Sequence, residues 1–273
     1  MTVEPLFSFI IPTFNRAALV CESIRSAIAW LDEKGDGEIV VVDDCSTDDT
    51  LERLRREFAA EIASGQVRLL PLPRNGGVIK AKNAGGRAAR GSWLIFLDSD
   101  DLMVPAAVAL MRRAFVEFAH APAMFFRCVD LVTGVPIGMP QDAPREYTLR
   151  DHLHATAYHS PYGECLPVVR RDAFGRFPYD ERLNGMEGVA YGRMIRAMGP
   201  IVIQPIVARS YRVEGDDRLS SAAGIRRRSR ALARGHWFVL REFGGDLTFA
   251  EWLRETAKVV VYRFRAFKAG FTD

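Results

Sequence analysis

Apolar residues in the first hundred positions alternate between short continuous runs and stripes at helical spacing. The continuous runs predict buried strands at 7–11, 38–44, 67–70 and 93–97. The segments between them have apolar side chains every three or four residues, or clustered alanines, and predict helices at 19–31, 51–62 and 80–90. Strands that alternate with helices form parallel sheets covered on both faces, so we expect an α/β fold with a mostly parallel central sheet.

The predicted helix boundaries carry their own signals. Ser46 and Asp49 have the spacing of a capping box before the second helix, and Gly91 ends the third. Pro105 opens a fourth helix, whose buried face is expected to hold Ala107, Leu110, Met111, Ala114, Phe115 and Phe118. After residue 121 the looser pattern predicts a helix at 189–198 and strands at 123–128, 163–169 and 201–207.

Polar clusters follow three of the predicted strands: PTFNR after the first, DDCSTDD after the second and DSDD after the fourth. Ligands of parallel α/β sheets bind beyond the carboxyl ends of the strands, so we expect the clusters to converge on one site. In the second cluster, Asp43 or Asp44 either accepts a hydrogen bond from a base or ribose, or caps the next helix. The chain has neither a Walker A nor a G-x-G-x-x-G sequence, so those loops do not hold a phosphate here.

The DSDD cluster places three carboxylates within four positions, directly after an apolar strand. Such close like charges repel unless a positive charge lies between them. Along an extended strand, Asp98 and Asp100 would point to the same side. Because Mg²⁺ is usually held by one or two carboxylates plus substrate phosphates, the cluster indicates a metal that holds a diphosphate. The alternative is that Asp100 and Asp101 cap the helix that starts near Pro105.

The three segments FIIPTFNR, EIVVVDDCSTDDT and NGGVIKAKNAGGRAARGSWLIFLDSDD, in this order, resemble the nucleotide-binding half of glycosyltransferase family 2. That family comprises inverting, metal-dependent sugar transferases with the GT-A fold. VVRRDAFGRFPYDERLNGMEGVAYGRMIRAMG resembles its acceptor-side segment, in which an Arg-Arg pair precedes a G-E-D element. The resemblance implies a GT-A-like domain at 1–215, divided into a nucleotide-sugar-binding half (1–101) and an acceptor half (102–215), and a basic helical extension at 216–273.

The family pattern implies a role for each motif residue. Thr13 and Phe14 would lie beside the base, and Asp44 would accept a hydrogen bond from it. Asp98 would contact the ribose or the surroundings of the metal, and Asp100 would bind Mn²⁺ or Mg²⁺. The residues implied to contact the nucleotide-sugar are Pro12, Thr13, Phe14, Asn15, Asp44, Asn75, Lys82, Asp98 and Ser99.

The G-E-D element implies the catalytic base. Counting back six residues from Arg193 assigns that role to Glu187, although a plain surface carboxylate is the alternative. The chain departs from the family here, because Met186 replaces the usual first acid and Glu187 the usual aspartate. Further on, Glu214 stands where the family often has a histidine near the metal. A carboxylate also suits a hard cation, but a solvated loop glutamate explains this position equally well.

The resemblance implies a direct displacement. Glu187 would accept a proton from an acceptor hydroxyl as that oxygen attacks the anomeric carbon, and the nucleoside diphosphate would leave. We expect a UDP-sugar donor and a glycan or lipid-linked acceptor, in bacterial-type surface polysaccharide or glycoconjugate synthesis. A sugar nucleotidyltransferase is one alternative, although such an enzyme usually has a basic, glycine-rich N-terminal loop, which PTFNR is not. A non-catalytic nucleotide-sugar-binding protein stays open because of the altered G-E-D element.

The net charge of +3 hides an uneven distribution. From Ile225 to the end there are 11 Lys/Arg and 5 Asp/Glu, a charge of +6, which leaves −3 for the remainder. Aromatic and aliphatic residues lie among these basic positions, a composition typical of helices at a membrane surface. A homodimer contact or a solvated helix face explains the tail as well. No nucleic-acid-binding motif is present, and we expect no such partner.

Hydropathy predicts a cytoplasmic chain, peripheral to the inner membrane if the tail binds lipid. Apolar runs are far shorter than the ~20 residues of a membrane-spanning helix, and MTVEPLFSFIIP lacks the basic start of a signal peptide. Four cysteines without metal-ligand spacing are expected to be buried free thiols: Cys21, Cys45, Cys128 and Cys165. Three histidines are expected in a loop: His152, His154 and His159.

Overall fold

The computed structural model describes residues 5–31, 36–158, 160–213 and 222–268. The strands are β1 (Phe7–Thr13), β2 (Gly37–Asp43), β3 (Val67–Pro71), β4 (Trp93–Phe96), β5 (Leu102–Met103), β6 (Ala123–Asp130), β7 (Arg145–Tyr147), β8 (Cys165–Arg170) and β9 (Ile201–Tyr211). The helices are α1 (Ala17–Leu31), α2 (Thr50–Glu57), α3 (Ala59–Ser64), α4 (Val78–Ala88), η1 (Pro105–Ala107), α5 (Val108–Glu117), α6 (Leu149–Tyr158), α7 (Arg171–Arg176), α8 (Gly188–Met198), α9 (Ala222–Arg227), α10 (Ser229–Phe243), η2 (Gly244–Asp246) and α11 (Phe249–Lys268).

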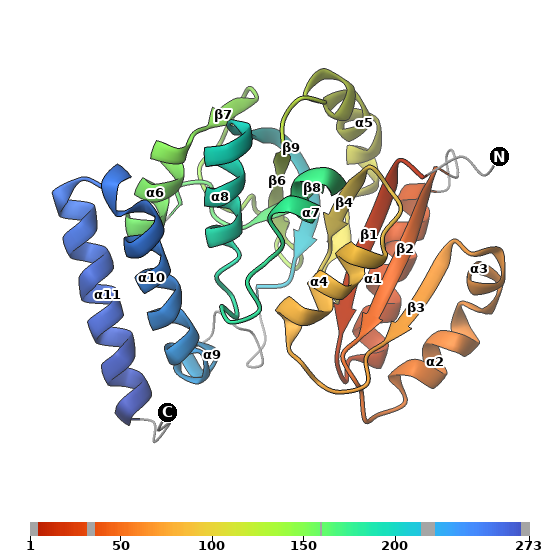
Figure 1. Cartoon of the computed structure of the whole chain (residues 1–273). Helices are drawn as coiled ribbons and strands as arrows, with labels where there is room; N and C mark the ends of the chain where they lie inside the picture. Colours follow the sequence, from red (N-terminus) through yellow and green to blue (C-terminus); the bar gives the residue numbers. More distant parts are fainter. Residues whose placement is uncertain (1–4, 32–35, 159, 214–221, 269–273) are drawn as a thin grey trace.

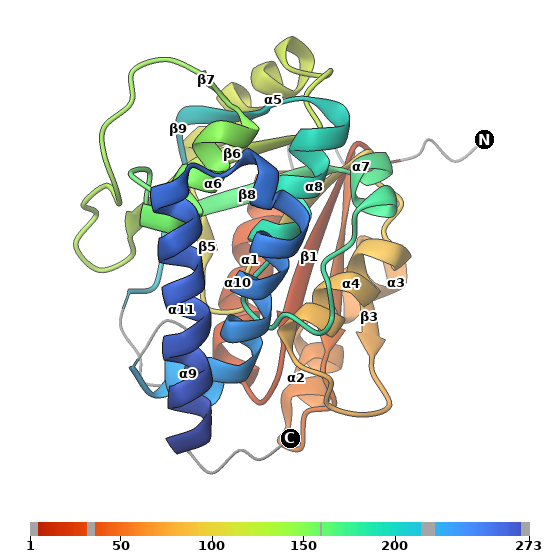
Figure 2. The same cartoon turned by 60° about the vertical axis from the view of Figure 1, so that its left-hand side comes forward.

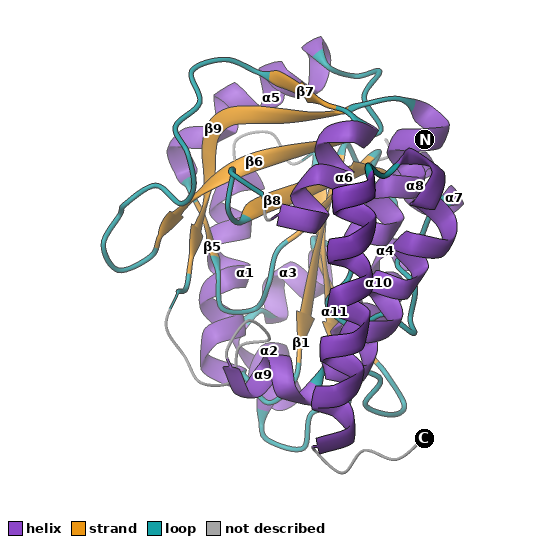
Figure 3. Cartoon of the chain, turned by 90° about the vertical axis from the view of Figure 1, so that its left-hand side faces the viewer, coloured by secondary structure: helices purple, strands orange, loops and turns teal. Residues whose placement is uncertain are grey.

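The strands in these ranges form one sheet in the order β3-β2-β1-β4-β8-β6-β9-β5, with β7 paired to β9 (Figure 1). The first four strands in this order are parallel. β8 runs antiparallel to β4 and β6, and β9 runs parallel to β6 with register shifts in the pairing. β9 bends across the far end of the sheet, so the sheet curls (Figure 3). The expected α/β class is confirmed, and the strands of the first hundred residues are parallel, as predicted.

Two apolar cores lie on opposite faces of the sheet because successive side chains of a strand point to opposite sides. Phe7 and Phe9 of β1 pack into one core, together with residues of α1 and α5. Trp30 of α1 meets both rings edge-on, with centroids 5.0 and 5.4 Å away. Ile10 of β1 points into the other core, under α4, α7 and α8. Helices therefore cover both faces, as the sequence predicts.

Three local expectations are wrong. The helix expected at 51–62 is two helices, α2 and α3, separated at Phe58. The capping box is absent from the described chain, because Asp48 rather than Ser46 accepts a hydrogen bond from the Thr50 amide at the start of α2 (3.0 Å). Leu110 is 49% exposed. Since η1 occupies Pro105–Ala107, α5 begins at Val108, and Val108 takes the buried place instead.

The described part of the predicted helical tail consists of α9, α10 and α11. α10 and α11 lie side by side, joined through η2, along the edge of the molecule beside α6 and α8 (Figure 2). Phe238, Val239 and Phe243 of α10 share a small apolar cluster with residues of α6 and α8. The tail is therefore packed onto the second half of the chain, next to the segment with the G-E-D element.

Candidate active site

The carboxyl ends of the parallel strands converge, as expected, because β2, β1 and β4 are neighbours in the sheet. A cavity of ≈ 1190 Å³ opens beyond these ends, between the parallel strands on one side and α8 on the other. The residues assigned from the sequence to the nucleotide-sugar, the metal and the catalytic base all line this cavity: Pro12, Thr13, Phe14, Asn15, Asp44, Asn75, Lys82, Asp98, Ser99, Asp100 and Glu187. The sequence thus predicted their proximity, while the role of each residue stays a prediction.

The loops after β1 and β2 hold each other in place. Asn15 has a φ of 51°, in the left-handed region that Asn tolerates, and its amide donates a hydrogen bond to Ser46 Oγ (2.9 Å). Its side-chain Oδ1 accepts a hydrogen bond from the Thr47 amide (2.8 Å). The polar groups of Asn15 are therefore used mainly in the contact between the two loops. The neighbouring Phe14 ring is 41% exposed.

Asp44 fixes the third loop of the site. Its Oδ1 accepts from the Gly76 amide (2.8 Å), and its Oδ2 accepts from the Gly77 amide (2.7 Å). Gly77 has a φ of +85°, which a side chain would strain, so the backbone conformation just before α4 favours glycine. Both carboxylate oxygens of Asp44 thus brace the loop that carries Asn75 to the cavity wall.

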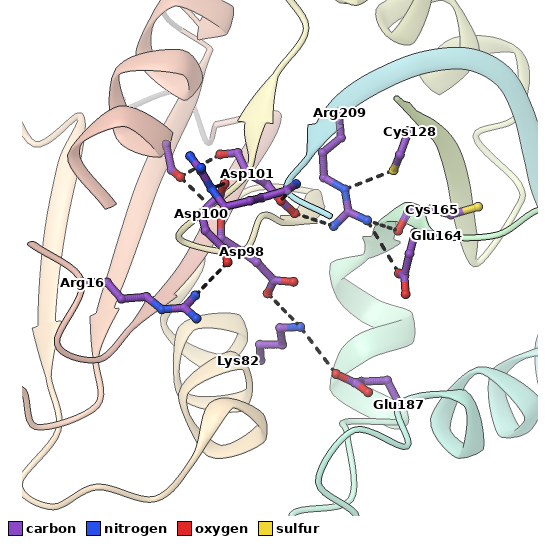
Figure 4. A network of polar contacts seen from close by, with 12 residues as sticks. Arg16, Lys82, Asp98, Asp100, Asp101, Cys128, Glu164, Cys165, Glu187 and Arg209 are labelled. Atoms are coloured by element: carbon purple, nitrogen blue, oxygen red, sulfur yellow. Dashed lines mark hydrogen bonds and ion pairs between the residues drawn. The ribbon is translucent and has the colours of Figure 1, made fainter. Parts of the chain in front are cut away.

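Three basic side chains separate the three carboxylates of the DSDD cluster (Figure 4). Asp98 Oδ1 lies 3.1 Å from Lys82 Nζ, and Asp100 Oδ2 lies 3.0 Å from Arg16 Nη1. Asp101 Oδ2 lies 3.1 Å from Arg209 Nη1. The expectation that an extended strand aligns Asp98 with Asp100 is wrong, because β4 ends at Phe96 and the two side chains turn to different cations. A cap role for Asp100 and Asp101 is also wrong, because Val104 precedes η1 and bears no capping side chain.

Asp101 and Arg209 form the innermost of these pairs. Both side chains are almost fully buried, and Asp101 Oδ1 also accepts a hydrogen bond from the Arg212 amide (3.0 Å). Burial raises the pKa of Asp101 to about 7, against the nearby Arg209 guanidinium, which favours the charged form. Arg209 also donates to Cys128 Sγ (3.1 Å) and to the Cys165 carbonyl (3.0 Å), so it ties β9 to β6 and β8 behind the cavity.

Lys82 links the two halves of the site. Its Nζ lies 3.1 Å from Asp98 and 3.5 Å from Glu187 Oε1. Burial by itself would lower the pKa of Lys82, but the two carboxylates outweigh it and hold that pKa above its usual value. Burial would likewise raise the pKa of Asp98, but Lys82, Arg209 and Arg16 hold it below its usual value. Both partners of the Lys82–Asp98 pair are therefore charged at neutral pH.

Glu187 stands immediately before α8, where the helix dipole favours a carboxylate. Met186, in the place of the family's first acid, packs against α10: a Cβ on Gly235 would lie 2.7 Å from its Cγ. Arg193, whose spacing marked Glu187, faces away from the cavity and bonds both carboxylate oxygens of Glu242 (2.7 and 2.5 Å). Met186 therefore contributes to the contact between the tail and the segment before α8. Of the two positions at which the family has acids, only Glu187 lines the cavity.

The loop expected around the histidines is in fact the helix α6. His152 is buried there, and its Nε2 lies 2.8 Å from the Gly188 carbonyl at the start of α8. Burial lowers the pKa of His152 to about 4, against this hydrogen bond, which favours the protonated form. His154, on the same helix, contacts Glu251 of α11 (3.1 Å). His159 and Glu214 lie outside the described residues.

The cysteines are free thiols, but only Cys21 and Cys128 are buried, whereas Cys45 and Cys165 are partly exposed. Within the described ranges, no cluster of three or more His, Cys, Asp or Glu side chains could hold a metal ion. Two hard carboxylates of the DSDD cluster, those of Asp98 and Asp100, line the cavity. These two fit Mg²⁺ or Mn²⁺ only when substrate phosphates and water complete the coordination.

Sequence reasoning identified Lys82 but missed the arginines of the site. Arg16 directly follows the PTFN turn, Arg209 lies near the end of β9, and Arg212 follows that strand, all far in sequence from the acids they meet. The signal that could have revealed them is the DSDD cluster itself, because three carboxylates so close together repel unless positive charge lies between them. Spacing alone does not reveal which of the chain's many arginines supply it.

Comparison with known proteins identifies the family. The family model "Glycosyl transferase family 2" matches residues 8–164, which is more than half of the chain, so the protein belongs to this family. The resemblance of the sequence motifs is thereby confirmed. Among the described helices, none combines the length and hydropathy that crossing a membrane requires.

The names of two relatives refer to glycan biosynthesis or sugar transfer. The succinoglycan biosynthesis protein ExoO of Rhizobium meliloti is 43% identical over 117 residues, which is 43% of this chain and 30% of ExoO. The poly(ribitol-phosphate) beta-N-acetylglucosaminyltransferase TarS of Staphylococcus aureus is 30% identical over 147 residues, 52% of this chain and 24% of TarS. The chain matches less than a third of the length of either relative.

Solved structures share the whole fold. S. aureus TarS 1–349 in complex with UDP-GlcNAc aligns with a TM-score of 0.65 at 22% identity, over 96% of this chain and 72% of that one. The mannosyltransferase PcManGT of Pyrobaculum calidifontis, in complex with GDP-Man and Mn²⁺, aligns with a TM-score of 0.64 at 20% identity, over 98% and 76%. The GT-A-like α/β fold expected from the sequence is therefore confirmed.

Proposed function

We propose that the protein is an inverting, metal-dependent glycosyltransferase that moves a sugar from a nucleoside-diphosphate sugar to a hydroxyl of a glycan or lipid-linked acceptor. The observation that carries this proposal is the bridge from Asp98 through Lys82 to Glu187, at the floor of a single large cavity. The bridge joins the nucleotide-binding motifs to the expected catalytic carboxylate. Family membership and relatives that act in succinoglycan and poly(ribitol-phosphate) glycosylation support a role in surface polysaccharide or glycoconjugate synthesis.

The nucleotide is proposed to lie across the ends of β1, β2 and β4. Pro12, Thr13 and Phe14 would line the base, with the exposed Phe14 ring available for stacking. Asp44 would act in two ways, accepting from the base while bracing the loop that holds Asn75. UDP is the proposed nucleotide, because the sequence relative TarS was solved in complex with UDP-GlcNAc.

The diphosphate is proposed to lie among the charged residues of the DSDD cluster. Asp100 would bind a divalent cation, with Asp98 and Ser99 beside it and substrate phosphates as further ligands. Bound there, Mn²⁺ or Mg²⁺ would neutralise the negative charge that grows on the leaving diphosphate. Arg16 and Lys82 add fixed positive charge on either side of the same carboxylates. Such preorganised charge stabilises a departing anion without further rearrangement.

Glu187 is proposed as the general base. It accepts the proton of the acceptor hydroxyl while that oxygen attacks the anomeric carbon, and a single displacement inverts the configuration there. Lys82 positions the Glu187 carboxylate, because their charged atoms lie 3.5 Å apart. The longer side chain of glutamate reaches the cavity from the start of α8, where the family has an aspartate.

The chain is proposed to divide by task. Residues 1–101 bind the donor, 102–215 form the acceptor side, and 216–273 are the basic helical extension. On the acceptor side, the cavity is lined by β7, α6, the loop before α8, α8 itself and the extension, through residues such as Tyr147, His152, Asn184, Tyr191 and Arg228. These side chains would decide which hydroxyl approaches Glu187.

A thermal-shift panel tests the donor site. Wild type and Asp100→Ala are heated with UDP, GDP, dTDP, CMP and ADP, each with and without Mn²⁺. A ligand at a hundred times its Kd stabilises the folded state by roughly 2.7 kcal/mol, which is readily detected. We expect one nucleoside diphosphate to stabilise wild type in the presence of metal, and Asp100→Ala to lose this shift. If no nucleotide shifts the wild type, the proposal is wrong.

A further inference from the structure

The outward face of α11 is apolar over its whole length. Phe249, Leu253, Val260, Phe264 and Phe267 are 47–77% exposed, which is unusual for large apolar side chains in one place. At 3.6 residues per turn these five positions fall within about 60° of one another and extend over about 27 Å. We call them the outer stripe of α11. No described part of the chain covers the outer stripe.

The inward face of α11 is a separate surface that already has its partners. Glu251, Glu255, Val259 and Ala266 are the residues that this helix buries. Glu255 Oε2 lies 2.7 Å from His236 Nδ1 of α10, and Glu251 contacts Arg150 and His154 of α6. The buried face is therefore more polar than the exposed one. The outer stripe is not needed to hold α11 on the protein, so its apolar character requires another explanation.

The exposed charges of α11 itself are of one sign. The acids of α11 are Glu251 and Glu255, and both are buried. Its exposed charged side chains are basic: Arg254, Arg263, Arg265 and Lys268. An exposed apolar stripe bordered by Lys and Arg matches the surface of a bilayer with anionic lipid. The apolar side chains would contact the acyl chains, and the basic side chains would contact the anionic headgroups.

We infer that the outer stripe of α11 binds the surface of a membrane that contains anionic lipid. A second copy of the chain fits this surface less well, because a twofold contact through the outer stripe would bring its basic borders close together. Aromatic side chains at the two ends of the stripe, Phe249 and Phe267, and the neighbouring Trp252 would enter the interfacial region. The helix would lie in the plane of the membrane surface rather than cross it.

Membrane binding by α11 would also serve the proposed reaction, because of where this helix lies. The inference itself does not depend on that reaction. α11 contacts α6 and α9, and both of these helices contribute residues to the cavity, among them His152 and Arg227. A membrane beneath α11 would therefore lie next to the acceptor side of the cavity. A lipid-linked acceptor could reach Glu187 without leaving the bilayer surface.

Vesicle sedimentation of the full chain, without nucleotide, tests the inference. The vesicles are phosphatidylcholine alone, or phosphatidylcholine mixed with phosphatidylglycerol. The test variant is Val260→Glu/Phe264→Glu, and the control variant is Val116→Glu/Val132→Glu, which places the same charges on exposed apolar positions elsewhere. We expect wild type and control to sediment with anionic vesicles, and the partition coefficient of the test variant to fall by roughly tenfold or more. Binding should weaken in high salt.

The outcomes separate the alternatives. Equal melting temperatures of the two variants would show that both are folded. If the full chain fails to sediment with anionic vesicles, or the test variant sediments as well as wild type, the inference is wrong. Light scattering then identifies the occupant. If wild type binds no vesicles and is a dimer, and the test variant is a monomer, a second copy covers the outer stripe and the inference is wrong. None of these results depends on glycosyl transfer.

Discussion

Lys82 and Glu187 lie 105 positions apart in the sequence, yet Lys82 Nζ and Glu187 Oε1 are separated by 3.5 Å. One residue comes from α4, beside the nucleotide-binding loops, and the other from the start of α8. The same lysine lies 3.1 Å from Asp98, so a single positive charge holds a donor-side and an acceptor-side carboxylate together. This arrangement defines the site more sharply than either motif alone.

Removing the positive charge of Lys82 should lower the stability of the protein. Lys82→Gln leaves Asp98 with less positive charge nearby, and we expect the free energy of unfolding to fall by about 1–2 kcal/mol. The effect is smaller than for a fully buried pair, because Asp98 retains contact with solvent. Urea unfolding measures it, with Lys80→Gln on the same helix as control. Equal losses in both variants would contradict the bridging role.

Restoring the family's acid at position 186 should harm the protein. Met186 packs against Gly235 of α10 and beside an apolar cluster, so Met186→Asp would bring a carboxylate to an apolar contact. We expect a loss of roughly 1–3 kcal/mol in unfolding free energy and no gain in activity. Met186→Leu, which keeps the volume and polarity, should cost less than about 1.5 kcal/mol. A more active and equally stable Met186→Asp would show that the missing acid limits this enzyme.

Asp44 should matter through the loop that it braces. Asp44→Ala removes both acceptors of the Gly76 and Gly77 amides, so the loop that carries Asn75 loses its anchor. We expect the Kd for the nucleoside diphosphate to rise by roughly tenfold or more in calorimetry, and Asp44→Asn, which keeps one acceptor, to fall between. Unchanged nucleotide affinity in Asp44→Ala would contradict both proposed roles of this carboxylate.

His152 should make stability depend on pH in a defined direction. Burial lowers its pKa from 6.5 to about 4, so between these values the unfolded chain binds a proton that the folded chain does not. The free energy of unfolding should therefore fall as the pH drops below about 6.5. At 1.36 kcal/mol per pKa unit, the loss approaches roughly 3 kcal/mol near pH 4.

The matched variant for this prediction is His152→Gln, whose amide can still donate a hydrogen bond to the Gly188 carbonyl but does not titrate. Urea unfolding of both proteins at several pH values between about 7 and 4 isolates the contribution of His152. Wild type should lose stability faster than the variant as the pH falls. Parallel curves would mean that His152 is not held neutral.

The sequence predicted the parallel half of the fold because its signals there are local. Runs such as that before Asp98 are apolar on both faces, and their polar ends meet because the carboxyl ends of parallel strands lie at the same edge of the sheet. The mixed half was harder. β5 and β7 have two and three residues, too few for a pattern, and the place of β8 between β4 and β6 depends on long-range pairing.

The acidic residues of the site were predictable from the sequence, as was Lys82, but its arginines were not. Carboxylates in DSDD and DDCSTDD stand out because they cluster in sequence, whereas Arg16 and Arg209 reach them from separate elements. His152 shows the same limit from the other side. Its cluster with His154 predicts a loop when read alone, although the apolar positions Leu149 and Leu153 beside it allow a helix with one buried face.

The most direct test of the account is turnover by Glu187→Gln. Release of nucleoside diphosphate from nucleotide-sugars is measured for wild type and the variant, with the acceptor or with water in its place, and donor affinity is measured by calorimetry. We predict that the variant binds donor as tightly as wild type but turns it over roughly 10²–10⁴-fold more slowly, and that Glu187→Asp lies between. If Glu187→Gln turns over as fast as wild type, or if wild type binds donor but never releases the diphosphate, the proposed role of Glu187 is wrong.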